Sequence, residues 1–252
     1  MLCLIHGYAL SGSGSNLWTR AVTQALCRSG ETVHIICQDR RPDQHDFVEA
    51  AYQYEPDGTR QMLFERTTPY TGRAILHRPQ LNLLPVYVRP AADVKSTMSI
   101  LDLPDNVIQT YLDRNERVLL RVVCENAVSA MHVNHVVLMS AVARRVSLRT
   151  GVPYAVMPHG SALEYVVRHD TRMQVMATEA LDGADCIVVL SDELAGRVHE
   201  VLPNIRDFDR KLTRTNVGVN ADEFRLVGRN ERRESIGQLG ATYSCISWQG
   251  SL

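Results

Sequence analysis

Residues 1–37 read MLCLIHGYALSGSGSNLWTRAVTQALCRSGETVHIIC, and this stretch decides the fold class. The short apolar run Leu2–His6 predicts a strand, and a loop of glycine and serine follows it. Apolar residues then recur at three- and four-residue spacing, which predicts a helix that Asn16 caps and Gly30 ends. A second apolar run, Val33–Cys37, predicts the next strand. Strand, helix and strand in this order indicate a parallel sheet.

The same cycle recurs later in the chain, after an irregular part in which Pro56-Asp57-Gly58 predicts a hairpin. The later elements that the pattern predicts are a helix from Pro104, a strand over Val128–Val133, a helix over Val136–Leu148, a strand ending at Met157, a helix over Thr171–Leu181, a strand over Asp185–Leu190, a helix capped by Ser191, and a strand over Leu212–Val217. After Arg229 the pattern weakens. We therefore expect an α/β, Rossmann-like three-layer domain with a mostly parallel sheet over residues 1–227, with residues 228–252 outside it.

The composition of the chain indicates which kinds of partner and which cellular compartment to expect. The chain has 252 residues, 45% of them hydrophobic, and a net charge of −1 from 27 basic and 28 acidic residues without any block of like charge. This argues against nucleic acid as a partner. The six cysteines form no CxxC pair, which indicates a reduced, cytoplasmic protein. No apolar run has the length of a signal peptide or a membrane span, so peripheral contact with the inner membrane face is the remaining membrane role.

The first candidate site is the loop Gly12-Ser13-Gly14-Ser15-Asn16, between the first strand and its helix, with Gly12, Ser13 and Gly14 as the phosphate-binding residues. Glycines allow close approach of a ligand to the backbone, and the N–H groups of the following helix favour an anion such as a phosphate. The alternative is an ordinary flexible turn. A dinucleotide fingerprint would need a third glycine where this chain has Leu17, although Asp39 stands where a ribose-binding acid is expected. A nicotinamide oxidoreductase is therefore an alternative function.

The second candidate site is Pro158-His159-Gly160-Ser161, which follows a strand end, where open α/β sheets bind ligands. His159 can form a hydrogen bond with a hydroxyl or phosphate oxygen, and it is expected to titrate near neutrality. The alternative is a histidine that only satisfies a loop carbonyl. Ser161 lacks the surrounding motif of a hydrolase nucleophile. Glu164, one turn further on, is expected either to orient a sugar hydroxyl or to stabilise a helix start.

The third candidate site is His132-Val133-Asn134-His135, also at a strand end. Two histidines at this spacing suggest a metal site, but no carboxylate or cysteine with ligand spacing accompanies them. We therefore expect Asn134 and His135 to make polar contacts with a substrate, and we expect no metal.

Taken together, these motifs resemble family 4 glycosyltransferases of the GT-B architecture. The resemblance rests on the glycine loop, on the pair His159-Gly160, on Ala180–Asp185 leading into Cys186–Ser191, and on Asn216-Val217-Gly218-Val219-Asn220 followed by Phe224. It covers roughly residues 1–227. Each motif is weak alone, but their order and spacing are fairly specific.

The resemblance implies a retaining transfer of a sugar from a nucleotide sugar, without a metal or another cofactor, in a cleft between two Rossmann-like domains. It implies that Gly12, Ser13 and Gly14 lie near the donor diphosphate and that His159 contacts the reacting sugar as the catalytic residue. Asn134, His135, Gly160, Ser161 and Glu164 would bind substrate, the acceptor being a sugar, a lipid-linked sugar or a small molecule.

The chain departs from the family because it lacks the second domain, which carries the nucleotide pocket. We therefore expect a truncated or split enzyme that is inactive alone and that needs a complementary domain or chain. A noncatalytic module that binds such a partner is the main alternative.

Overall fold

The computed structural model describes residues 1–88, 96–216, 218 and 225–244. Met1–Thr215 form one compact unit, and Asn216–Leu252 form a second. The motif residues Val217, Val219, Asn220 and Phe224 lie outside the described residues.

Within the described residues, one sheet holds nine strands in the order β11-β10-β9-β8-β1-β2-β5-β3-β4. Its strands are β1 (Leu2–Ile5), β2 (Thr32–Ile36), β3 (Val48–Tyr54), β4 (Arg60–Glu65), β5 (Arg73–Pro79), β8 (Ala130–Asn134), β9 (Tyr154–Met157), β10 (Cys186–Val189) and β11 (Leu212–Arg214). All pairs are parallel except β3 with β4. The expected α/β class with a mostly parallel sheet is therefore confirmed.

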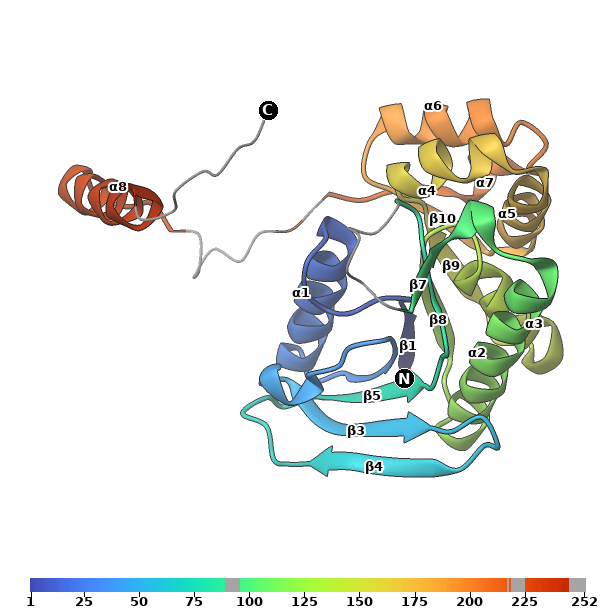
Figure 1. Cartoon of the computed structure of the whole chain (residues 1–252), viewed down its shortest axis with the longest axis horizontal. Helices are drawn as coiled ribbons and strands as arrows, with labels where there is room; N and C mark the ends of the chain where they lie inside the picture. The colour runs from blue at the N-terminus through green and yellow to red at the C-terminus, as the bar shows by residue number, and fades with distance from the viewer. Residues whose placement is uncertain (89–95, 217, 219–224, 245–252) are drawn as a thin grey trace. The chain divides into compact units, whose positions relative to one another are not determined.

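The central strands are apolar on both faces because helices cover both. In β1, Cys3 and Ile5 belong to one hydrophobic core and Leu4 to a second, as the two-residue period of a strand requires. The first core packs against α2 (Asp105–Glu125) and α3 (Met139–Thr150), and the second against α1 (Gly14–Arg28). Figure 1 shows α1 on one side of β1 and α2 with α3 on the other.

The buried face of the first helix was predicted only in part. Of its expected apolar positions, Val22 and Leu26 pack against the second core, whereas Leu17, Ala21 and Ala25 are exposed. The fully buried residues of this helix are Asn16, Thr19, Thr23 and Cys27. The threonines tolerate burial because each hydroxyl donates to a helix carbonyl, Thr19 to Ser15 (2.8 Å) and Thr23 to Thr19 (2.8 Å). These two polar side chains can therefore be buried, because hydrogen bonds within the helix satisfy their hydroxyl groups.

The predicted hairpin at Pro56-Asp57-Gly58 is confirmed, because β3 and β4 pair antiparallel across it. Gly58 adopts φ +92, and the backbone N–H of Glu55 donates to the carbonyl of Thr59 (2.9 Å). The hairpin extends the sheet at one edge instead of forming a separate insertion. Two short parallel strands, β6 (Leu84–Val86) and β7 (Thr97–Ser99), form a second small sheet.

The remaining helices follow the later strands. They are α4 (Gly160–Tyr165), α5 (Thr171–Gly183), α6 (Asp192–Val201) and α7 (Phe208–Lys211), with one-turn 3₁₀ helices at Pro42–Gln44, Ile100–Asp102 and Val167–His169. Ser191 caps α6 as predicted, since its hydroxyl accepts from the backbone N–H of Leu194 (3.1 Å).

The second unit contains α8 (Arg229–Ser244), which the weakening pattern did not predict. Its side chains from Arg229 to Leu239 are all exposed, so it has no apolar face from which periodicity could reveal a helix. In the described part of the chain, no helix combines the length and the apolar character needed to cross a membrane.

Candidate functional site

The candidate site lies where the sheet changes direction. From β1 the chain proceeds to β2 on one side, and from β8 it proceeds to β9, β10 and β11 on the other. In open α/β sheets, the crevice at the carboxyl ends of two such strands is where ligands bind. His6 follows β1, Asn134 ends β8 with His135 directly after it, and His159 follows β9. Parallel pairing places all four at one edge of the sheet.

The three histidines among these four residues lie together. We call His6, His135 and His159 the histidine cluster. The ring of His135 lies 6.0 Å from that of His6 and 4.6 Å from that of His159, measured between centroids. The ring of Tyr87, which follows β6, lies 4.6 Å from His135. The expected neighbours His159 and His135 are therefore brought together by the fold.

Asn134 connects His159 to helix α1. Its side-chain oxygen accepts from Nε2 of His159 (3.2 Å), and its amide nitrogen donates to the hydroxyl of Thr19 (2.8 Å). Asn134 is 1% exposed. Its side chain therefore orients the His159 ring, a positioning role distinct from the substrate contact that the sequence predicts.

His135 is the least satisfied polar side chain of the cluster. It is 3% exposed, and neither ring nitrogen has a hydrogen-bond partner among the described residues. Its backbone adopts φ +73, a left-handed conformation that is uncommon outside glycine. A buried, unpaired and strained polar residue is typical of a ligand site.

Burial keeps the histidines of this edge neutral. It lowers the pKa of His6, His132 and His159 to about 4, and it lowers the pKa of His135 well below its ordinary value. The expectation that His159 titrates near neutrality is therefore wrong, because the charged imidazolium loses its hydration inside the protein. Neutral imidazoles can form hydrogen bonds with sugar hydroxyls, but they bring no positive charge to a phosphate.

This burial predicts a loss of stability in mild acid. The folded pKa of about 4 for His6 lies below the ordinary 6.5, so the unfolded chain binds more protons between these values. Above about pH 6.5, the free energy of unfolding should not depend on these histidines' protonation. As the pH falls from 6.5 towards 4, it should decrease by roughly 1 to 3 kcal/mol for each such histidine. Urea unfolding across this range measures the fall. His6→Gln should flatten the profile, whereas His169→Gln, at an exposed position, should leave it unchanged; a flat wild-type profile would contradict the prediction.

The start of α1 contributes partial positive charge at this edge. Its first backbone N–H groups have no partner within the helix, and they follow the loop of Gly12 and Ser13. Gly12 adopts φ +104, a conformation suited to glycine. Ser13 is the N-cap residue, so the prediction that Asn16 caps this helix is wrong.

Asn16 instead ties the glycine loop to the histidine cluster. Its side-chain oxygen accepts from Nε2 of His6 (2.9 Å) and from the hydroxyl of Ser13 (2.8 Å). Because both partners precede helix α1, the Asn16 side chain links the glycine loop to His6 at the end of β1. His6 and Tyr87 were missed as site residues, although a histidine that ends a buried strand is a signal for His6. Asn16 was part of the predicted glycine loop.

Glu164, Gly160 and Ser161 lie in the short helix α4, directly after His159. The carboxylate of Glu164 forms ion pairs with Arg168 (3.2 Å) and Arg197 (3.4 Å). A Cβ atom at Gly160 would lie 3.1 Å from a guanidinium nitrogen of Arg197. This part of the predicted site is therefore organised around arginine, and contact of these residues with substrate stays a prediction.

Asp39 does not serve the nicotinamide alternative. Its carboxylate accepts from the backbone N–H groups of Leu10 (2.8 Å) and Arg41 (2.8 Å) and from Nε2 of His45 (3.1 Å). Although burial opposes it, these hydrogen bonds hold the pKa of Asp39 at about 2. The acid on which a ribose contact would depend is thus occupied in shaping the loop after β2. Among the described residues, no group of three or more His, Cys, Asp or Glu is suited to hold a metal ion.

Three solved structures have a similar fold over nearly the whole of this chain. Sucrose-phosphate synthase from Thermosynechococcus elongatus is 16% identical with a TM-score of 0.60, over 94% of this chain and 52% of that one. A glycosyltransferase from Rickettsia africae ESF-5 is 14% identical with a TM-score of 0.51, over 95% and 49%. The N-terminal domain of trehalose-6-phosphate phosphatase from Candida albicans is 12% identical with a TM-score of 0.54, over 96% and 54%.

These likenesses show the fold: a Rossmann-like half of a GT-B structure. The chain spans about half the length of the solved structures it matches. No protein-family model matches the chain, and no curated protein matches it significantly. The narrower resemblance to family 4 therefore stays a prediction.

Proposed function

We propose that residues 1–227 are the acceptor-side domain of a retaining glycosyltransferase that uses a nucleotide sugar. The observation that carries this proposal is the site at the strand switch between β1 and β8, where an open helix N-terminus adjoins a cluster of neutral, buried histidines. A helix N-terminus favours a diphosphate, and neutral imidazoles favour hydroxyl groups. A nucleotide sugar and its acceptor present both kinds of group.

The proposed reaction breaks the bond between the sugar C1 and the diphosphate oxygen and forms a bond between C1 and an acceptor hydroxyl oxygen. The acceptor proton leaves on the departing diphosphate. Charge therefore builds up on the diphosphate in the transition state, where the N–H groups that follow Gly12 and Ser13 would stabilise it. His159, oriented by Asn134, would hold a hydroxyl of the transferred sugar.

The second half of the site would come from another Rossmann-like domain that binds the nucleotide. The proposal places the donor between the two domains and the acceptor on this one, with both substrates held in line for transfer. The similar structures are about twice as long as the part this chain matches, which supports such an arrangement.

The experiment that tests the proposal supplies a second, nucleotide-binding domain. The chain is fused after residue 227 to a nucleotide-binding domain of a GT-B glycosyltransferase, and sugar transfer is assayed with UDP- and GDP-sugars against a panel of sugar and lipid-linked acceptors. Transfer that depends on the fused domain supports the proposal. Tight association of the two domains without transfer favours instead a noncatalytic partner-binding module.

Gly14→Val tests the donor-phosphate loop without disturbing the fold. Apart from its chain neighbours and the backbone of its own helix, nothing among the described residues lies within 4 Å of a Cβ atom at Gly14, and its φ is not in the left-handed region. Valine should therefore leave thermal stability nearly unchanged while its methyl groups obstruct a diphosphate. We expect donor affinity in the fused enzyme to fall about tenfold or more, measured by calorimetry.

Gly196→Val is the matched control, because Gly196 lies inside helix α6 and its added Cβ also meets nothing within 4 Å. It should leave donor affinity unchanged. Equal donor affinity in Gly14→Val and wild type would show that the loop is only a turn.

A further inference from the structure

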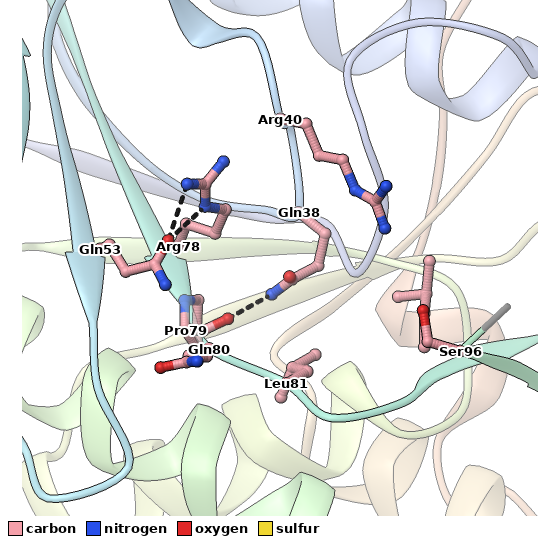
Figure 2. A pocket seen from close by; sticks show the side chains of 9 residues that line it. Gln38, Arg40, Gln53, Arg78, Pro79, Gln80, Leu81 and Ser96 are labelled. Atoms are coloured by element: carbon pink, nitrogen blue, oxygen red, sulfur yellow. Dashed lines mark hydrogen bonds between the residues drawn. The ribbon is translucent and has the colours of Figure 1, made fainter.

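A cavity of about 390 Å³ opens at the carboxyl ends of β2, β5 and β3. Strand β2 is the neighbour of β1, so the cavity shares the sheet edge that carries His6. Its polar lining includes Gln38, Arg40, Gln53 and Arg78, which Figure 2 draws as sticks. The size suits a small-molecule ligand.

Arg78 is held in place by the protein and still has hydrogen-bonding capacity. Its Nε (2.9 Å) and Nη2 (2.7 Å) both donate to the side-chain oxygen of Gln53, as the dashed lines of Figure 2 show, and Nη1 donates to the carbonyl of Asp39 (2.9 Å). A guanidinium has five N–H donors, so two remain for a ligand. A fixed guanidinium loses little conformational entropy when it binds.

Arg40 is the second guanidinium of the cavity. No hydrogen bond or ion pair involves its side chain among the described residues, and it lies across Gln38 from Arg78 in Figure 2. The side-chain nitrogen of Gln38 donates to the carbonyl of Pro79 (3.0 Å), which leaves its oxygen as an acceptor for a hydroxyl. Two basic groups thus flank one hydroxyl acceptor.

No acidic residue offsets these charges in the described lining of the cavity. Asp39 lies between Gln38 and Arg40 in the sequence, but its carboxylate is buried and bonded to Leu10, Arg41 and His45. The cavity therefore presents two positive charges and neutral amides. The guanidinium group of arginine can donate paired hydrogen bonds to the oxygens of a phosphate.

We propose that this cavity binds the phosphate of a phosphorylated monosaccharide, with Arg40 and Arg78 on the phosphate and Gln38 on a sugar hydroxyl. This inference rests on the proposed function for the role of that molecule as acceptor. It adds the substrate class: an anionic sugar, bound on the same sheet edge as His159.

The test measures binding to the 252-residue chain by calorimetry at low salt, with glucose 6-phosphate, inorganic phosphate, glucuronate and glucose as probes. We expect glucose 6-phosphate to bind most tightly and glucose not to bind. Arg40→Gln should weaken glucose 6-phosphate binding about tenfold or more, because it removes a charged donor pair. The Arg40 side chain has no hydrogen-bond or ion-pair partner in the part of the chain that the structure describes, so its substitution should leave the melting temperature unchanged.

Arg28→Gln is the matched control. It removes the same charge from the exposed last turn of α1, at the opposite edge of the sheet, and should leave binding unchanged. Equal affinity in wild type and Arg40→Gln, or no binding of glucose 6-phosphate, would overturn the proposal. Tighter binding of glucuronate would overturn the phosphate assignment, and equally tight binding of inorganic phosphate would overturn the assignment to a sugar.

The fused enzyme separates this inference from the proposed function. Transfer to neutral acceptors that Arg40→Gln leaves unchanged would overturn the inference and leave the glycosyltransferase proposal standing. Arg40-dependent binding of glucose 6-phosphate without any sugar transfer would leave the cavity assigned and remove the proposed function.

Discussion

The isolated 252-residue chain is expected to transfer no sugar above the rate without protein, and fusion to a nucleotide-binding GT-B domain is expected to create activity. Only one wall of the proposed site is present in the described residues: the N-terminus of α1, the histidine cluster and helix α4. Holding two substrates in reacting geometry contributes up to about 7 to 11 kcal/mol. One wall cannot hold the donor against the acceptor, so the full effect should depend on the added domain.

The measurement is product formation over many turnovers, with equal concentrations of the chain alone, the added domain alone, and the fusion. A fusion that carries Gly14→Val controls for activity of the added domain by itself, since this loop belongs to the present chain. Multiple turnovers by the chain alone would contradict the proposed division of the site.

Replacing His159 with alanine in the fused enzyme is expected to lower kcat about 100-fold or more, the typical effect of losing one preorganised donor to the reacting group. Stability should change much less. The variant loses one hydrogen bond to Asn134, which corresponds to about 1 to 2 kcal/mol and a fall of roughly 2 to 8 °C in Tm. Initial rates and thermal unfolding on the same preparation measure both quantities.

His169→Ala is the matched control, because His169 is exposed in a 3₁₀ turn and lies outside the histidine cluster. It should retain wild-type kcat. Full activity in His159→Ala combined with a large fall in Tm would show that this histidine supports the fold and not the reaction.

The elements of the fold were predictable because their signals are local. The buried strand β1 and the helix that starts after Pro104 each bury one continuous apolar run or stripe, and such patterns are visible in a few neighbouring residues. The hairpin at Gly58 was predictable for the same reason, since turn chemistry requires particular residues. Strand β4 has no buried side chain. Its sequence therefore lacks the alternation of apolar and polar residues that would identify it as the edge strand of the sheet.

The candidate site was predictable only as a set of positions. Polar residues at strand ends marked Asn134, His135 and His159, because parallel strands bring their carboxyl ends to one edge. The sequence alone determined that these residues meet a glycine loop there.

Only the tertiary structure determines the hydrogen-bond partners and the protonation states of these residues. Asn16, predicted as a helix cap, bonds His6. Asp39, weighed as a ribose contact for the nicotinamide alternative, bonds Leu10 in the loop after β1 and Arg41 and His45 in its own loop. Burial lowers the pKa of His159, which was predicted to titrate near neutrality, to about 4. The reason is that hydrogen-bond partners and desolvation come from residues distant in sequence, so a side chain's charge and free donors exist only once the strands have packed together.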